Sequence, residues 1–464
     1  MTSYGVALAG AVALGLAGGM PQAQAAPLSE AEGQALRDEV ERLRAKLEAI
    51  EKRLADGGTP PPPAPQPPAP QQAAAAPASA PATRIEWKGS PRFVSEDRAF
   101  KVKGRIQADA NYVAAPEGLN DRGLGFSNEF RRIRLGGEGQ LGSGFGYKLE
   151  LELSDNGVDL VDTFVTYQKG PWLVTLGNHN AFQGIDELTG DTSGSFMERA
   201  AFTDAFNFER RLGLSLQHER GALLAQLGVF TDDITALANA SDGPAGGDEN
   251  NAFSIDGRLV YAPKIDDTQL HLAGSAHWRK LGRIAAAPTR YRQRPYIHSS
   301  NSRLIGTPGL PVERELNYGL ELAAIDGPWH AAGEVHWLRA DRIGLPSARF
   351  WGGYAEVGYF LTKGDTRAYD NGYFGAMKPA RAMGKGGVGA VQVNLRYDYL
   401  DLDSGAVRGG KQNGYMAALI WAPIANLRFN LNYAYLDYDG AVPLADGRTS
   451  YGLHTFGSRF ELDF

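Results

Sequence analysis

The sequence contains no cysteine, although it is 464 residues long. Disulfides, thiolate metal sites and cysteine nucleophiles are therefore excluded. Beyond the N-terminus it also lacks any run of about 18 apolar residues, which excludes a protein that crosses a membrane with helices. An excess of positive charge is missing as well, because 47 Lys and Arg residues stand against 53 Asp and Glu, a net charge of -6. This balance gives no sign of nucleic acid binding.

Glycine and apolar residues are plentiful, with 58 Gly, 43% hydrophobic residues and 10% aromatic residues. A transmembrane β-barrel fits this composition, because only every second residue of its strands faces lipid. A large soluble β protein would have a similar composition. The bulk numbers therefore leave these two classes open.

The N-terminus resembles a secretory signal peptide. A short apolar stretch from Val6 to Gly19 precedes Ala23-Gln24-Ala25-Ala26, a small-residue cleavage pattern. Residues 2–5 carry no Lys or Arg, so the positive charge of this segment depends on the amino terminus alone. We expect a signal peptide over residues 1–26; the alternative is a disordered tail rich in Ala and Gly.

The next segment, residues 27–58, has the spacing of a coiled coil. Its apolar residues alternate at intervals of four and three: Leu36, Val40, Leu43, Leu47, Ile50 and Leu54. Gly57-Gly58 ends the predicted helix. We expect a periplasmic helix that associates across a homo-oligomer, or else a single amphipathic helix that lies on its own barrel. Residues 59–84, rich in Pro, Ala and Gln, predict an extended spacer.

From residue 85 onward the pattern changes to period two. Along Lys101–Tyr112 every even position is apolar or small and every odd position is polar or charged, so one face meets oil and the other meets water. Marking such segments predicts about sixteen strands. They cover residues 99–113, 128–141, 145–154, 158–168, 171–178, 210–219, 221–230, 251–263, 268–279, 315–326, 328–340, 348–362, 387–400, 412–422, 425–437 and 452–464.

The connections and the last strand favour an outer-membrane barrel over residues 85–464. Short connections such as 142–144 and 169–170 alternate with long ones such as 231–250, 280–314 and 363–386, which is typical of periplasmic turns and external loops. The final strand places Phe456, Phe460 and Phe464 on one face and ends on Phe464. Such an ending resembles the assembly signal of outer-membrane proteins, although any amphipathic edge strand can end in Phe.

Two segments are candidates for lining the lumen. Segment 180–200 breaks the period-two pattern and is too long for a turn, so we expect it to fold inward; the alternative is an exposed surface loop. Arg290, Arg292 and Arg294 stand two residues apart and share one face of an extended backbone. Their guanidinium groups suit the binding of passing anions, or else of lipopolysaccharide phosphates or plain solvent.

More arginines occur on the first two predicted strands. By alternation, Arg132 and Arg134 share the polar face that carries Arg105. Arg131 can join them only if the strand bulges there or if Arg131 lies at the rim.

Several motifs together resemble the phosphate-selective porin O/P family of outer-membrane channels, over roughly residues 95–464. They are Phe130-Arg131-Arg132 at the start of a strand, Gly146-Tyr147-Lys148-Leu149-Glu150, Asp162 to Tyr167, the loop at Gly184, Glu198-Arg199, and the arginines of Thr289–Arg294.

The resemblance implies a sixteen-stranded homotrimer embedded in outer-membrane lipid and lipopolysaccharide, with a third extracellular loop folded inward. It also implies an arginine ladder that guides phosphate or polyphosphate to a constriction. The ladder positions are matched by Arg105, Arg131, Arg132, Arg290, Arg292 and Arg294, and Arg199 matches an arginine on the constriction loop.

One departure from the family pattern bears on selectivity. Where phosphate-selective members carry a lysine in the constriction loop, this chain has Glu187, in the run Gly184-Ile185-Asp186-Glu187, with Asp191 close by. An anion in a narrow pore repels phosphate. We therefore expect a vestibule that attracts small anions, with less selectivity for phosphate at the constriction than the family name suggests.

Enzyme signatures are lacking, so we expect no catalytic residues, no metal and no cofactor. His271 and His277 lie inward by parity on one predicted strand, without a serine and acid constellation, and are expected to be hydrogen-bonding groups of the lumen or the rim. The main hypothesis is a passive channel for inorganic anions or small solutes. The alternative is a structural protein that tethers the envelope through its periplasmic coiled coil.

Overall fold

The computed structural model describes residues 41, 44–46, 48, 83–87, 89–154, 157–231, 252–281 and 288–464. The chain divides into two compact units, Met1–Ala78 and Ser79–Phe464. In the first unit the described residues are helical. The predicted signal peptide, nearly all of the coiled coil and nearly all of the spacer lie outside the described residues. No helix of the described part is long and apolar enough to cross a membrane.

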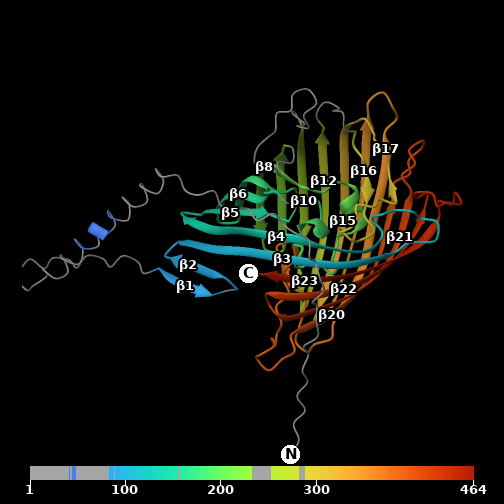
Figure 1. Cartoon of the computed structure of the whole chain (residues 1–464). Helices are drawn as coiled ribbons and strands as arrows, with labels where there is room; N and C mark the ends of the chain where they lie inside the picture. Colours follow the sequence, from blue (N-terminus) through green and yellow to red (C-terminus); the bar gives the residue numbers. More distant parts are fainter. Residues whose placement is uncertain are drawn as a thin grey trace, which may run out of the picture. The chain divides into compact units, whose positions relative to one another are not determined.

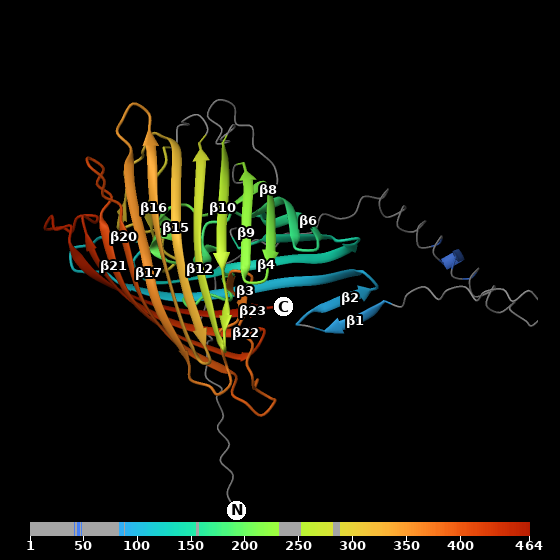
Figure 2. The ribbon, with the colours of Figure 1, turned by 180° about the vertical axis from the view of Figure 1, so that it is seen from behind.

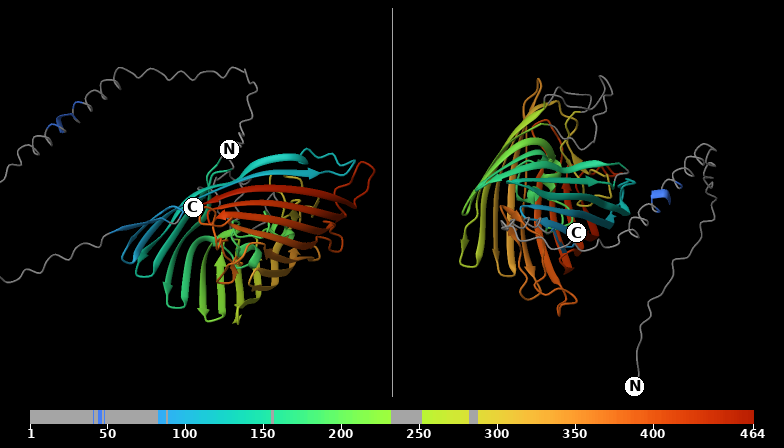
Figure 3. Two further views of the ribbon diagram at one scale, coloured as in Figure 1. Left: turned by 90° about the horizontal axis from the view of Figure 1, so that it is seen from below. Right: turned by 90° about the vertical axis from the view of Figure 1, so that its left-hand side faces the viewer.

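Sixteen antiparallel strands of the second unit close into a barrel (Figures 1 and 2). The sheet closes where β23 pairs with β3, for example Phe456 with Tyr112, and Figure 3 shows how the wall curves. The strands are β3 Arg98–Ala114, β4 Gly125–Gly142, β5 Phe145–Glu152, β6 Asp159–Lys169, β7 Trp172–Asn180, β8 Arg210–Arg220, β9 Leu223–Phe230, β10 Phe253–Tyr261, β12 Thr268–Lys280, β15 Val312–Asp326, β16 Trp329–Arg342, β17 Ala348–Phe360, β20 Ala390–Asp401, β21 Lys411–Ile424, β22 Leu427–Asp439 and β23 Tyr451–Asp463.

Alternation along each strand separates an apolar outer face from a polar inner face. On β23, Phe456 and Phe460 are exposed toward the outside, whereas Thr455 and Arg459 are buried inside. The barrel has no edge strand where it closes, so every strand of the wall finds backbone partners on both sides. All sixteen strands predicted from period two are present, with ends that differ by a few residues.

The alternation did not reveal the hairpin that precedes the barrel, β1 Arg84–Trp87 and β2 Pro91–Ser95. Strand β2 pairs with the first residues of β3, such as Phe93 with Phe100. It therefore continues the sheet along β3 beyond the end of β23. Five further strands have two residues each and lie in the connections: β11 Lys264–Ile265, β13 Arg292–Gln293, β14 Ile305–Gly306, β18 Tyr369–Asp370 and β19 Tyr373–Phe374.

The connections fall into two sets, because antiparallel strands place successive connections at opposite ends of the barrel. One end, the short-turn end, carries connections such as 143–144, 170–171 and 327–328. The other, the long-loop end, carries the connections 181–209 and 281–311. The prediction was wrong about 363–386, because this segment joins β17 to β20 at the short-turn end. Length alone could not show the end to which a loop belongs.

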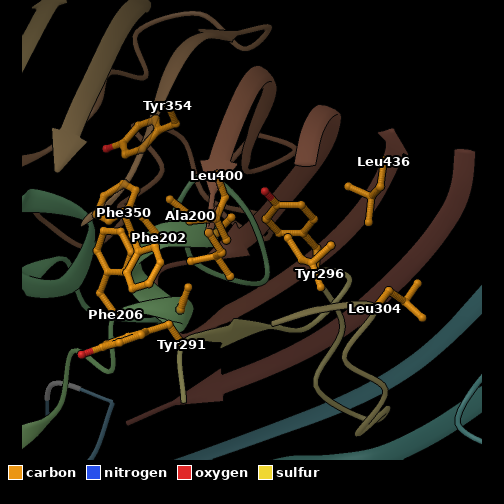
Figure 4. Close-up of a cluster of buried hydrophobic side chains, with 14 of the residues drawn as sticks. Ala200, Phe202, Phe206, Tyr291, Tyr296, Leu304, Phe350, Tyr354, Leu400 and Leu436 are labelled. Atoms are coloured by element: carbon orange, nitrogen blue, oxygen red, sulfur yellow. The ribbon is translucent and has the colours of Figure 1, made fainter. Parts of the chain in front are cut away.

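Three connections pack inside the barrel: the first inward loop (residues 181–209), the second inward loop (288–311) and the third inward loop (361–389). The first contains two short helices, α2 Ile185–Leu188 and α3 Ala201–Ala205. Its Phe202 and Phe206 join Tyr291 and Tyr296 of the second loop in one buried apolar cluster (Figure 4). Wall residues such as Phe350 complete the cluster. Apolar packing therefore holds the loops against the wall.

Candidate functional site

The first inward loop is fixed by carboxylates of the opposite wall. Glu334 on β16 accepts hydrogen bonds from the backbone N–H groups of Ile185, at 3.0 Å, and Asp186, at 2.8 Å. These are free N–H groups at the start of α2. Gly184 precedes them with φ of 147°, and a Cβ there would lie 2.2 Å from Oε1 of Glu334. Glycine at this position lets the backbone approach the carboxylate.

Asp186 and Asp398 hold the second helix of the same loop. The carboxylate of Asp186 accepts hydrogen bonds from the backbone of Ala200 and the hydroxyl of Thr203, both at 2.9 Å. Asp398 on β20 accepts one from the backbone of Ala201 at 3.0 Å. Asp186, expected to line the constriction, borders the cavity described below, but its carboxylate is also an internal cap of α3.

Strand β4 bulges where two arginines stand side by side. Arg132 lies opposite Gln107 and Phe130 lies opposite Ala108, so Arg131 is the extra residue. Both guanidinium groups point into the lumen, where Arg131 contacts Glu198 at 3.4 Å and Arg132 contacts Asp191. Of the two alternatives that the sequence left for Arg131, a bulge or a rim position, the structure shows the bulge.

Asp191 of the first inward loop is surrounded by three arginines of the wall. Its carboxylate lies 2.7 Å from Nε of Arg132 and 3.8 Å from Nη1 of Arg134, and it forms an ion pair with Arg105. Burial alone would raise the pKa of Asp191, but the positive charges of Arg105 and Arg132 hold that pKa well below its usual range. The acid is therefore ionised and neutralises part of the arginine cluster.

Glu198 makes a second contact of this kind. Its carboxylate lies 2.6 Å from Arg459 on β23, and Arg459 also binds both oxygens of Asp109 on β3 at 2.7 Å. A fork with two parallel bonds is a strong and directional interaction. The closing strand of the barrel is thus tied to the first inward loop.

Glu187 forms an ion pair with Arg199 at 3.2 Å, within the same loop. Burial raises the pKa of Glu187, and the neighbouring charge of Arg199 opposes this shift. The sequence placed these two residues in the constriction loop without relating them. In the structure each compensates the charge of the other.

The three arginines of the second inward loop, Arg290, Arg292 and Arg294, differ in their exposure. Arg290 and Arg292 are exposed, while Arg294 borders the central cavity and lies 3.9 Å from Asp204 of the first inward loop. The loop crosses the lumen, since the hydroxyl of Tyr296 lies 3.0 Å from Gln412 on β21. The structure therefore brings Arg105, Arg131 and Arg132 together with Asp191 and Glu198, but not with Arg290 or Arg292.

A cavity of about 250 Å³ lies between the loops and the wall. Its lining contains seven arginines and six carboxylates, so positive charge exceeds negative charge by little. The arginines are Arg131, Arg132, Arg199, Arg210, Arg294, Arg367 and Arg396; the acids are Asp186, Glu187, Asp191, Glu198, Asp204 and Glu356.

The third inward loop reaches this cavity from the short-turn end, which the sequence did not predict. Arg367 donates a hydrogen bond to the backbone carbonyl of Ser193, and the backbone N–H of Phe374 donates one to the hydroxyl of Thr189 at 3.2 Å. The carbonyl of Gly372 accepts one from Arg258 at 2.7 Å. A long stretch of small and polar residues between two strands was the available signal.

The two histidines act as expected from their parity. His271 lies between Glu321, at 3.2 Å, and the hydroxyl of Tyr369, at 2.7 Å. His277 hydrogen-bonds to Asp256. Among the residues that the structure describes, no group of three His, Asp or Glu side chains is arranged to hold a metal ion.

A closed sixteen-stranded barrel with loops folded into its lumen has the architecture of a porin. The chain belongs to the family of phosphate-selective porins O and P, whose model matches residues 100–464. It is also similar to an uncharacterized protein of Caulobacter vibrioides, 59% identical over 453 residues that cover 94% of this chain and 91% of that protein. The protein is therefore an outer-membrane porin, a channel rather than an enzyme.

Solved structures share the fold. An anion-selective porin from Comamonas acidovorans superposes with a TM-score of 0.51 at 14% identity, covering 79% of this chain and all of that one. The outer-membrane protein OmpT of Vibrio cholerae gives 0.49 at 9% identity, covering 80% of this chain and 99% of that one. At such identities the first likeness supports the barrel fold alone.

Proposed function

We propose that this porin conducts small inorganic anions, including phosphate, but does not select phosphate strictly. One observation carries the proposal: the inner wall presents Arg105, Arg131 and Arg132 side by side, yet Asp191 and Glu198 occupy them. Guanidinium groups in the lumen attract anions, while the paired carboxylates compete with any anion that enters. Arg294 of the second inward loop borders the same cavity. We propose that the exposed Arg290 and Arg292 of this loop attract anions before they reach it.

Phosphate is the anion class that the family name suggests. Guanidinium groups free of carboxylates replace more of the hydration shell of a phosphate than paired ones do. Here Glu187 is paired with Arg199, and Asp191 with Arg105 and Arg132, so these groups offer phosphate less than unpaired arginines would.

The test is ion selectivity in planar lipid bilayers. The purified full-length protein is inserted, and reversal potentials are measured in a KCl gradient and then with phosphate opposed to chloride. We expect an anion preference together with a ratio of phosphate to chloride permeability near one. A cation preference contradicts the proposal, and the absence of conductance contradicts a channel of any kind.

The remaining expectations are proposals that rest on the sequence pattern and on the family. We propose a signal peptide over residues 1–26, a coiled coil over 27–58, a spacer over 59–84 and a homotrimer in contact with lipopolysaccharide. The mass of the mature protein tests the cleavage site. Light scattering in detergent, with and without residues 28–82, tests the trimer and the contribution of the coiled coil. The family match favours a channel over the structural tether.

A further inference from the structure

Arg367 occupies an unusual place among the cations of the lumen. It belongs to the third inward loop, at the short-turn end, which in outer-membrane barrels faces the periplasm. The residue is only 5% exposed, and its guanidinium group lies 4.6 Å from the ring centre of Phe374. Apart from its bond to the carbonyl of Ser193, it reaches into the cavity.

The other arginines of the cavity are all compensated. Each lies between 2.6 and 3.9 Å from a carboxylate: Arg131 from Glu198, Arg132 from Asp191, Arg199 from Glu187, Arg210 from Asp162, Arg294 from Asp204, and Arg396 from Glu356. Within the described part of the chain, Arg367 has no carboxylate within 4.0 Å, and its Nε makes no hydrogen bond.

Arg367 also lies between two cavities of the barrel interior. It lines the central cavity of about 250 Å³, and it lines a second cavity of about 810 Å³ at the short-turn end, between the turns at Pro328 and Lys264. Of the residues that the structure describes, it alone borders both cavities. The guanidinium group of Arg367 is therefore placed to meet a solute that moves between the two cavities.

We propose that Arg367 is the group that sets anion preference on the periplasmic side of the constriction, where it binds a passing inorganic anion such as phosphate. The inference rests on the proposed anion conduction and names the residue that carries it. The arginines of the inner wall that match the family pattern, Arg105, Arg131 and Arg132, already form ion pairs with Asp191 and Glu198. The uncompensated charge comes instead from a loop at the opposite end.

The physical reason is the cost of an unpaired buried charge. A guanidinium group removed from water without a counter-ion is unfavourable, and an anion that enters between the two cavities offsets that cost while it is bound. Burial lowers the pKa of Arg367 to about 10, so the group stays protonated at neutral pH. Glu356 is the carboxylate whose charge acts most on Arg367, but it lies beyond 4.0 Å and is bound to Arg396 at 2.6 Å, so a transient anion does not have to displace it from Arg367.

Two substitutions of Arg367 distinguish an effect of its charge from an effect of its hydrogen bond to the loop. Arg367→Lys keeps the charge and removes the planar fork, whereas Arg367→Gln removes the charge and keeps a side chain that can donate to Ser193. Lys363→Gln is the matched control. It removes one positive charge from the same loop, and Lys363 borders only the second cavity, at the short-turn end. Each full-length variant is inserted into planar bilayers in a KCl gradient.

We expect Arg367→Gln to lower the ratio of anion to cation permeability by about threefold or more, and Arg367→Lys to retain most of it. Lys363→Gln should change the ratio less. Inorganic phosphate added on the short-turn side should inhibit the chloride current of the wild type and of Arg367→Lys, but inhibit Arg367→Gln more weakly.

Two outcomes overturn the inference. The first is an anion-selective wild type whose selectivity and phosphate inhibition do not change in Arg367→Gln. The second is an equal loss in Arg367→Gln and Arg367→Lys, which would assign the residue to holding the loop. A wild type without anion preference contradicts the proposed function itself. If Arg367→Gln fails to assemble, the test is inhibition of the chloride current by phosphate in the wild type and in Arg367→Lys. The inference is overturned if phosphate inhibits neither protein.

Discussion

The carboxylate of Asp191 lies 2.7 Å from Nε of Arg132, and the same carboxylate forms an ion pair with Arg105. Asp191 reaches this place from the first inward loop, whereas both arginines belong to the wall. A carboxylate in this position has the charge and the acceptor geometry of the anion that the arginines would otherwise bind. The chain therefore supplies a counter-ion of its own where phosphate would be held.

Asp191→Asn should raise the ratio of phosphate to chloride permeability by about threefold to tenfold, because Arg132 loses its carboxylate partner and Arg105 keeps only Asp463, at 3.3 Å. Reversal potentials in bilayers with the two anions opposed measure this ratio. Asp446→Asn is the control, since Asp446 pairs with Arg448 at 2.7 Å in an exposed loop. An unchanged or smaller ratio in Asp191→Asn would show that Asp191 does not compete with phosphate.

Glu187→Lys should also raise the preference for phosphate, because it replaces an anion of the cavity lining by a cation. The new lysine would also repel Arg199, which lies 3.2 Å from Glu187 in the structure. Glu187→Gln removes the charge without that repulsion, so its permeability ratio should lie between those of the wild type and Glu187→Lys. A ratio that does not respond to either change means that Glu187 does not line the ion path.

The wall of the barrel could be predicted from the sequence because its signal is local. Lipid on one side and water on the other impose period two along each strand, as in Lys101–Tyr112. Two adjacent arginines left a bulge or a rim position open for Arg131, and the structure shows the bulge. The pattern needed no knowledge of which strands are neighbours.

The interior could be predicted only in part, because it depends on contacts between distant segments. The sequence named Asp186, Asp191, Glu187 and Arg199 but could not pair Asp191 with Arg105 across the lumen. The third inward loop was missed, since its length and its small and polar residues mark a long connection without showing that the connection turns into the barrel. Its Arg367 matched no family motif that the sequence offered.

Glu334 should be a positioning residue for the first inward loop. Glu334→Ala removes the acceptor for the N–H groups of Ile185 and Asp186, and each hydrogen bond to a charged group contributes about 1.5–3 kcal/mol. We expect a lower unfolding temperature and a larger, noisier single-channel conductance, because α2 can then move in the lumen. Glu334→Gln keeps one acceptor oxygen and should fall between wild type and Glu334→Ala. A steady conductance of wild-type size in Glu334→Ala would mean that two other wall carboxylates suffice to hold the loop: Asp398, which accepts from Ala201, and Glu356, which accepts from the hydroxyl of Ser195 at 2.8 Å.

The terminal residue Phe464 is tied to Gly104 on β3. Their backbones exchange two hydrogen bonds, of 3.0 and 2.9 Å, and a Cβ added at Gly104 would lie 2.2 Å from the ring of Phe464. The ring thus packs over a glycine on the outer face, at the place where the barrel closes. Gly104→Leu should displace the ring and weaken closure, because backbone and ring both prevent the new side chain from fitting.

We therefore expect Gly104→Leu to reduce the amount of folded barrel recovered from outer membranes severalfold, as measured by resistance to unfolding in detergent on a gel. Gly257→Leu is the matched control: it is a glycine of strand β10, where the nearest atom to an added Cβ lies at 3.8 Å. Deletion of Phe464 should resemble Gly104→Leu, because both changes remove the same contact. Equal recovery of Gly104→Leu and Gly257→Leu would show that the contact between Gly104 and Phe464 does not control how the barrel closes.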